Sequence, residues 1–187
     1  MGLLDHEGTF LLVVDIQEKF RGKIYNLDEV IENTIKLVKL AEVYKMPIVV
    51  TEQYPQGLGR TIEEITKLLP QENVFYPVEK ITFSCVREPK FTDILSDLRK
   101  SGYNSIIVCG IEAHICVYQT SIELLELGFN IHLASDATGS REKENHKTIL
   151  RFLLQKGINV KPTETIIFEV LKAAQTPEFK TILPYLK

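Results

Sequence analysis

The segment from Ser105 to Ser121 joins a strand pattern to a helix pattern and carries a cysteine at the junction. The apolar run Ile106–Cys109 stops at Gly110, and Cys116 follows near the start of the helical pattern. A thiol at a helix N-terminus lies near unpaired N–H donors and the positive end of the helix dipole, and both lower its pKa. The pattern therefore predicts that Cys116 is a nucleophile with a lowered pKa.

An acid and a base with complementary chemistry follow two other predicted strands. Asp15 ends the apolar run 9–14, and Lys80 follows a weaker strand candidate at 73–78. With Cys116 they suit acyl transfer: the thiolate attacks a carbonyl carbon, Asp15 relays the proton, and Lys80 holds the carboxylate. Backbone N–H groups around Cys116 would form an oxyanion hole. From placement alone, a structural cysteine, a capping aspartate and a surface lysine are the more frequent cases.

The elements that would position these side chains alternate along the chain. Alternating strands and helices of this length indicate βαβ units and a mainly parallel sheet with helices on both faces. In such sheets ligands bind beyond the carboxyl ends of the strands, where Asp15, Lys80 and Cys116 all lie. The predicted strands are 9–14, 47–51, 73–78, 105–109, 130–134 and 158–161. The predicted helices are 27–45, 61–69, 91–101, 113–127, 142–156, 164–174 and 177–186.

Length and composition limit the class of protein. The 187 residues favour one domain over 1–187, long enough to bury a sizeable core. The net charge of -3 gives no basic field for nucleic acid or an anionic membrane, and the apolar runs are too short to span a bilayer. The first residues do not form a secretory signal. The three cysteines, Cys85, Cys109 and Cys116, are too few for a disulfide framework, so we expect a cytoplasmic protein.

The motifs Asp15-Ile-Gln17 and Gly110-Ile-Glu-Ala-His-Ile-Cys116, with Lys80 between them, resemble the isochorismatase-like cysteine hydrolases. The resemblance runs from residue 9 to about residue 171, and the segment 51–59 is most similar to the isochorismatase-domain-containing branch. It implies a three-layer, doubly wound α/β fold with a six-stranded sheet in the order 3-2-1-4-5-6. It also implies an Asp15–Lys80–Cys116 triad, and a homo-oligomer.

The resemblance also implies a shape for the turn before the nucleophile. A cis peptide bond is expected between Ile111 and Glu112, with the backbone N–H groups of Glu112 and Cys116 as oxyanion donors. The Glu112 side chain complicates this assignment, because a carboxylate that pointed inward would repel the developing anion. It would have to point away, or bind a cationic group of the substrate.

The histidine content separates this chain from the metal-dependent members of the family. Nicotinamidases of the family use histidine ligands for a metal, but no histidine lies between His6 and His114. No His, Cys and Asp residues have metal-ligand spacing, so neither a metal nor another cofactor is expected. A true isochorismatase is also disfavoured, because that reaction proceeds without the nucleophilic cysteine.

The resulting hypothesis is a metal-free cysteine hydrolase that cleaves a small-molecule amide or related C–N bond through a Cys116 thioester. Gln17, Phe20, Tyr54 and Phe83 are the predicted substrate-binding residues, although Phe20 alone is as consistent with the core. The alternative is a non-catalytic interaction or ligand-sensing protein on the same fold. A redox-sensing thiol is a weaker third hypothesis, since no resolving cysteine lies near Cys116 in sequence, although Cys85 could approach it in space.

Overall fold

The computed structural model describes residues 2–186, and six strands form one sheet at its centre. The order is β3-β2-β1-β4-β5-β6, and every neighbouring pair is parallel. This confirms the predicted fold class and the predicted strand order. The strands are β1 Thr9–Val14, β2 Ile48–Gln53, β3 Val74–Lys80, β4 Ser105–Ile111, β5 Asn130–Gly139 and β6 Asn159–Lys161.

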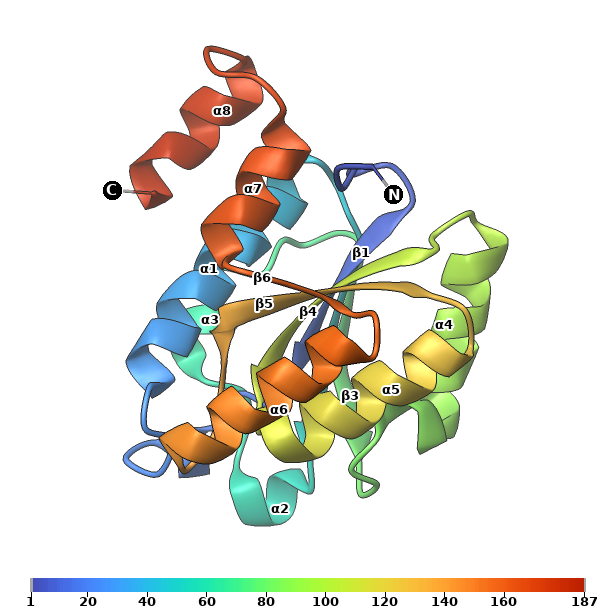
Figure 1. The fold of residues 1–187 in the computed structure, drawn as a ribbon, viewed down its shortest axis with the longest axis vertical. Helices are drawn as coiled ribbons and strands as arrows, with labels where there is room; N and C mark the ends of the chain where they lie inside the picture. Colours follow the sequence, from blue (N-terminus) through green and yellow to red (C-terminus); the bar gives the residue numbers. More distant parts are fainter. Residues whose placement is uncertain (1, 187) are drawn as a thin grey trace.

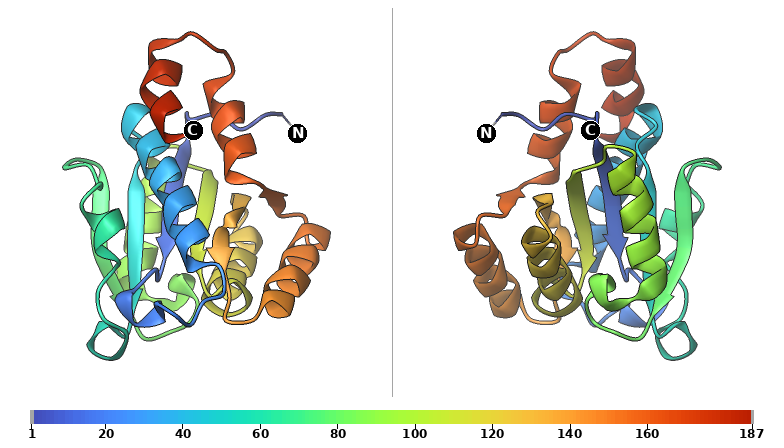
Figure 2. Two further views of the ribbon diagram at one scale, coloured as in Figure 1. Left: turned by 90° about the vertical axis from the view of Figure 1, so that its left-hand side faces the viewer. Right: turned by 90° about the vertical axis from the view of Figure 1, so that its right-hand side faces the viewer.

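Helices cover both faces of the sheet, as Figures 1 and 2 show. Side chains of a strand alternate between its two faces, so the buried strand β1 supplies both hydrophobic cores. Leu11 and Val13 pack into the core beneath α1, while Phe10, Leu12 and Val14 pack into the core beneath α4 and α5. The central strand is apolar throughout because neither of its faces meets water.

The helices follow the predicted positions, with most ends shifted by a few residues. No helix within residues 2–186 is long and apolar enough to cross a membrane. The longer helices are α1 Leu27–Val43, α4 Pro89–Lys100, α5 Tyr118–Glu126, α6 Lys143–Gln155, α7 Thr163–Leu171 and α8 Pro177–Ile182. The short ones are α2 Pro55–Leu58 and α3 Glu63–Thr66, together with the single turns Glu18–Phe20, Cys85–Arg87 and Leu183–Tyr185.

Three differences from the predicted elements lie near the candidate site. Strand β3 continues to Lys80, because Glu79 and Lys80 pair with the end of β2. The helix predicted from residue 113 begins as the π-helix η3, Ala113–Val117, before α5 follows. The helix predicted over 61–69 is reduced to α3, and α2 forms in a segment for which no helix was predicted.

Strands β1 and β4 approach each other closely at the end that carries the candidate residues. Gly110 pairs with Val14, and a Cβ atom at Gly110 would lie 2.1 Å from the Val14 carbonyl oxygen. Gly110 also has φ +127°, a backbone conformation that side chains rarely adopt. Glycine is therefore required where β4 passes the last residue before Asp15.

Candidate active site

Asp15 ends β1 with its carboxylate held on both oxygens. Its Oδ1 accepts a hydrogen bond from Thr51 Oγ1 at 2.7 Å, and its Oδ2 accepts one from Lys80 Nζ at 2.7 Å. The residue is 1% exposed and has φ +52°, in the left-handed region that aspartate tolerates better than most residues. From the turn after β1, the side chain bonds to Thr51 of β2 and to Lys80 of β3.

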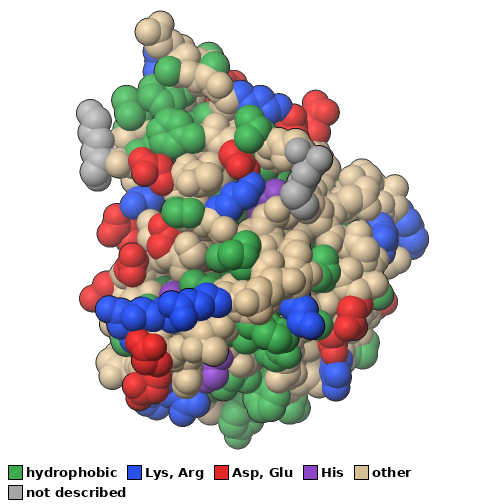
Figure 3. All heavy atoms as spheres, in the orientation of Figure 1, with side chains coloured by type: hydrophobic (Ala, Val, Ile, Leu, Met, Phe, Trp, Pro, Cys, Tyr) green, Lys and Arg blue, Asp and Glu red, His purple; other side chains and the backbone are tan. Residues whose placement is uncertain are grey.

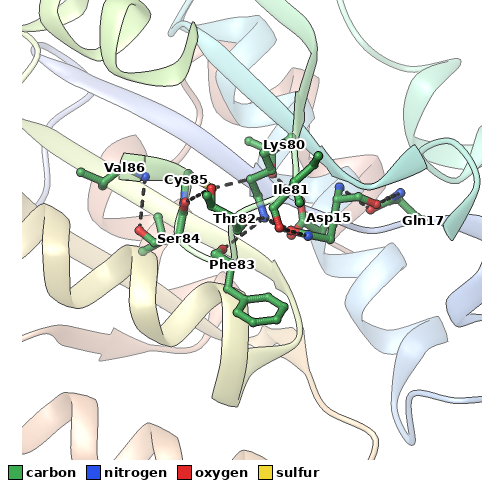
Figure 4. A network of polar contacts seen from close by, with 12 residues as sticks. Asp15, Gln17, Lys80, Ile81, Thr82, Phe83, Ser84, Cys85 and Val86 are labelled. Carbon is green, nitrogen blue, oxygen red and sulfur yellow. Dashed lines mark hydrogen bonds and ion pairs between the residues drawn. The ribbon is translucent and has the colours of Figure 1, made fainter. Parts of the chain in front are cut away.

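Lys80 is the centre of a buried polar network, drawn in Figure 4. Its ammonium group lies within hydrogen-bond distance of Asp15 Oδ2, of Gln53 Oε1 at 2.7 Å, and of the Thr82 and Phe83 carbonyl oxygens at 3.2 Å. Burial is the largest single effect and lowers the pKa of Lys80, but the charge and hydrogen bond of Asp15, together with Cys85 and Cys116, outweigh it and the pKa is raised. Lys80 is therefore a fixed cation, and its three donors are fully engaged.

Cys116 lies in η3 and meets Asp15 at one small cavity. The cavity has a volume of about 100 Å³, and the Cys116 residue is only 7% exposed. Its lining comes from the ends of β2 and β4 and from the segments that follow β1, β2, β3 and β4. The lining residues are Asp15, Phe20, Gln53, Leu58, Phe83, Ile111, Glu112, Ile115 and Cys116.

The ionisation of Cys116 contradicts the prediction from its position near a helix start. Burial raises the pKa of the thiol, and the Asp15 carboxylate raises it further, while Lys80 opposes this only in part. The prediction of a lowered pKa was wrong because burial removes the water that would stabilise a thiolate. Burial and the neighbouring Asp15 charge thus both favour the protonated thiol of Cys116 over its thiolate.

The turn before Cys116 carries an acidic side chain that is paired with a cation. The peptide bond between Ile111 and Glu112 is cis. The Glu112 carboxylate accepts hydrogen bonds from the Arg141 backbone N–H at 3.0 Å and from Arg141 Nε at 3.1 Å. The negative charge of Glu112 is therefore compensated by Arg141. Arg141 was not predicted, because it lies after β5 and no local pattern connects it with Glu112.

The predicted substrate-binding residues divide into two groups. Phe20 and Phe83 line the cavity, whereas Gln17 and Tyr54 do not. The Gln17 amide is fully buried and bonds to the Gln53 backbone and to the Gly59 carbonyl, so it fixes the loop after β2. Tyr54 is 53% exposed and lies on a separate surface depression.

The assignment of Tyr54 to the pocket was therefore wrong by one position. Successive residues of a strand point to opposite sides, and it is Gln53, the last residue of β2, that reaches the cavity and Lys80. Leu58 and Ile115 also belong to the lining and were not predicted. Pro55, a residue favoured at the first position of a helix, was the signal that could have predicted the short helix carrying Leu58.

The remaining candidate side chains have structural partners. His114 Nδ1 lies 2.9 Å from Ser140 Oγ, so it does not form a dyad with Cys116. Cys85 is fully buried, and burial raises its pKa to about 11. Cys109 is buried inside β4, where burial raises its pKa to about 12. Within residues 2–186, no three or more His, Cys, Asp or Glu side chains are grouped so that they could hold a metal ion.

The chain is similar to known proteins along nearly its whole length. Residues 9–165 match the family model described as Isochorismatase domain. Isochorismatase family protein 1A of Dictyostelium discoideum is 34% identical over 187 residues, which cover 98% of this chain and 88% of that protein. The structure of MAR1 ribonuclease from Caenorhabditis elegans is 32% identical with a TM-score of 0.89, covering 99% of this chain and 92% of that chain.

A more distant structure shares the fold alone. The YcaC gene product from Escherichia coli, described as an octameric hydrolase of unknown specificity, has a TM-score of 0.85 at 18% identity. The match covers 98% of this chain and 93% of that chain. From the family model and the relatives that match along its whole length, we conclude that the chain belongs to the isochorismatase family.

Proposed function

We propose that the protein is a cysteine hydrolase that cleaves a small-molecule amide or related C–N bond. The observation that carries this proposal is the meeting of Asp15 and Cys116 at one cavity, with Lys80 bonded to Asp15 at 2.7 Å. A non-catalytic protein has no need for a buried thiol, a buried carboxylate and a buried ammonium at one point. Such groups are costly to bury and are concentrated at functional sites.

In the first half of the proposed reaction, Cys116 Sγ attacks the amide carbonyl carbon as its proton passes to Asp15. The carbonyl oxygen becomes an oxyanion, which the backbone N–H groups of Glu112 and Cys116 stabilise. Asp15 then gives the proton to the amide nitrogen, the C–N bond breaks, and ammonia or an amine leaves. A thioester on Cys116 remains.

In the second half, Asp15 takes a proton from water as the water oxygen attacks the thioester carbonyl carbon. The C–S bond breaks, the carboxylic acid leaves, and the proton returns from Asp15 to Cys116. Lys80 stays protonated throughout, because its raised pKa and its four acceptors favour the charged form. It acts by positioning Asp15 and by offsetting its charge.

The test compares the wild type with Cys116→Ala and Cys109→Ala in single-turnover assays on small amides, with ammonia release as the readout. Cys109→Ala is the matched control, because Cys109 is buried outside the cavity lining. Loss of at least about a hundredfold in rate for Cys116→Ala alone would support the mechanism. Equal rates for Cys116→Ala and the wild type would overturn it.

The name of the Caenorhabditis elegans relative makes RNA cleavage the second candidate for this chain. Two observations oppose it. A cavity of about 100 Å³ is too small for a nucleotide, and Figure 3 shows Lys and Arg interspersed with Asp and Glu on the visible face. An RNA arm belongs in the same assay, and cleavage of RNA with no amide turnover would replace the first proposal by the second.

A non-catalytic, ligand-sensing role is the alternative from another class. It predicts that amides bind without being consumed, and that Cys116→Ala binds them as the wild type does. Isothermal titration of both proteins beside the turnover assay separates the two roles. Saturable binding by the wild type with no product over many hours would contradict the hydrolase.

We further propose that the protein assembles as a homo-oligomer. Tyr54, Ile81 and Phe83 present large apolar side chains to solvent beside the cavity, with exposures of 53%, 79% and 54%. Exposed apolar groups of this kind favour association. Light scattering coupled to size-exclusion chromatography tests it, and a mass equal to the chain mass of 21.4 kDa at micromolar concentration would contradict it.

A further inference from the structure

The cavity beside Cys116 has walls of two kinds. Its apolar walls are the side chains of Phe20, Leu58, Phe83, Ile111 and Ile115. Its polar residues other than the nucleophile are Asp15, Gln53 and Glu112. A ligand in this space is recognised by those groups that still have a free hydrogen-bond donor or acceptor.

Each of the three polar side chains is already bonded to the protein. Both Asp15 oxygens are occupied by Thr51 and Lys80. Gln53 accepts from Lys80 through Oε1 and donates to the Ile81 carbonyl at 2.6 Å through Nε2. Because Asp15 and Gln53 are bonded to protein groups, the polar contact that remains for a ligand is with the reacting centre itself.

Glu112 is occupied in the same way. Its carboxylate is bonded to Arg141, which is not part of the cavity lining. Lys80 and Arg141, the cations that bond to the carboxylates of the lining, are thus both committed to protein groups. A charged group on the substrate would lose its water in this space and gain no partner of opposite charge.

The size of the cavity sets a second limit. An apolar cavity of about 150 Å³ lined by leucine, isoleucine and phenylalanine takes up benzene. At about 100 Å³, this cavity is smaller than a benzene site by about one third. It matches a short aliphatic chain better than an aromatic ring.

We propose that the site selects amides with a small, uncharged aliphatic acyl group, about the size of a propionyl group. This rests on the proposed function, since it names the substrate class of the same cavity. Phe83 is the main size-determining residue, because its ring forms part of the wall and Figure 4 shows it directed away from the Lys80 network. Its replacement opens the cavity without disturbing that network.

The first test measures kcat/KM for propionamide, for the charged analogue succinamate and for benzamide. We expect kcat/KM for propionamide to exceed the value for each of the others by at least about a hundredfold. Benzamide is disfavoured because it is too large, and succinamate because its charge has no partner in the cavity. Phe83→Ala should raise kcat/KM for benzamide by roughly tenfold and lower it for propionamide. Ile81→Ala is the matched control, since Ile81 is an exposed neighbour outside the lining. A preference for succinamate or benzamide in the wild type would overturn the proposal.

The second test does not depend on turnover. Iodoacetamide and iodoacetate are similar in size and differ in charge, so we would compare their rates of alkylation of Cys116 by peptide mass spectrometry. Each rate is divided by the rate for free mercaptoethanol at the same pH. A ratio at least about tenfold in favour of iodoacetamide supports selection of neutral groups, even if no amide is hydrolysed. Equal normalised rates, or faster reaction with iodoacetate, would contradict it.

Discussion

Glu112 directs its carboxylate to Arg141, 3.0 Å from the backbone N–H and 3.1 Å from Nε, while its own backbone lies at the turn before the nucleophile. One residue therefore serves two purposes in the proposed mechanism. Its N–H would face the developing oxyanion, while its negative charge is paired with a cation outside the cavity lining. Arg141 would then act as a positioning residue, through Glu112.

Arg141→Ala should lower kcat for the preferred amide by roughly tenfold, with a smaller change in KM. The Glu112 charge then lacks its cation near a developing negative charge. Arg141→Ala with Glu112→Gln should recover most of the loss, because the uncompensated charge is gone. Arg87→Ala, which breaks a surface ion pair with Glu123, is the control. An unchanged kcat in Arg141→Ala would rule out this electrostatic role.

Lys80→Met should destabilise the protein by about 3–5 kcal/mol, because it leaves the Asp15 carboxylate buried without its cation. Removing both charges in Asp15→Leu/Lys80→Met should cost less than Lys80→Met alone. Urea unfolding of the three proteins measures this. Lys67→Met, which removes an exposed pair with Glu63, should change the stability by less than about 1 kcal/mol. Equal losses in the single and double variants would contradict a charge-burial penalty.

Asp15→Asn should have opposite effects on the ionisation of Cys116 and on amide hydrolysis. Burial and the Asp15 charge both raise the pKa of the thiol, so the wild type should react with iodoacetamide more slowly than a free thiol until the pH is strongly alkaline. Removing the Asp15 charge moves that pKa down, so alkylation at pH near 8 should become faster while amide hydrolysis is lost. The measurement is the alkylation rate against pH for both proteins. Slower alkylation in Asp15→Asn would show that Asp15 does not oppose the thiolate.

Glu52 should contribute to stability only above acidic pH. Burial alone would raise its pKa, but hydrogen bonds from Thr61, Arg60 and Tyr76 outweigh this and lower it below 4.5. A carboxylate with a lowered folded-state pKa stabilises the protein above its unfolded pKa, and the contribution is lost as the pH falls through the folded value. Glu52→Gln should cost about 2 kcal/mol at neutral pH, and the difference from wild type should shrink at pH below about 4. Unfolding curves at several pH values test this, and a difference independent of pH would contradict it.

Gly110→Ala should destabilise the protein by about 3–5 kcal/mol, because the added Cβ meets the Val14 backbone at 2.1 Å in a strained conformation. Gly157→Ala isolates the conformational part, since Gly157 has φ +92° and nothing within 4 Å of the added Cβ. Its cost should be about 1–2 kcal/mol. Thermal unfolding of the two variants measures their loss of stability. Similar losses would mean that β1 and β4 move apart around the added Cβ without a further penalty.

Much of the fold was predictable because the hydrophobic pattern is strong where burial is complete. The runs at 9–14 and 105–109 are apolar on both faces, which marks central strands of a parallel sheet. Their adjacency, and with it the meeting of Asp15 and Cys116, came from the family resemblance rather than from the pattern. The end of β3 was missed because Glu79 and Lys80 are charged, and only the pairing with Asp15 makes Lys80 a buried strand residue.

The parts of the site that were not predicted depend on side-chain direction and on burial. Gln53 and Tyr54 are neighbours in sequence, yet one reaches the cavity and the other faces solvent. The partnership of Glu112 with Arg141 joins two loops, and no spacing in the sequence encodes it. The pKa of Cys116 reverses the expected direction because it depends on burial, which a local pattern does not reveal.

The pairing of β1 with β4 also determines when the site can exist during synthesis. Asp15 and Lys80 lie in the first half of the chain, and Cys116 follows β4 in the second half. In a nascent chain that ends before β4, the apolar strand β1 has one unpaired edge. Such edges pair readily with other chains. Insertion of β4 closes that edge and brings Cys116 to Asp15 in the same event. The proposed activity would therefore appear together with resistance to aggregation, and a chain truncated before β4 would lack both.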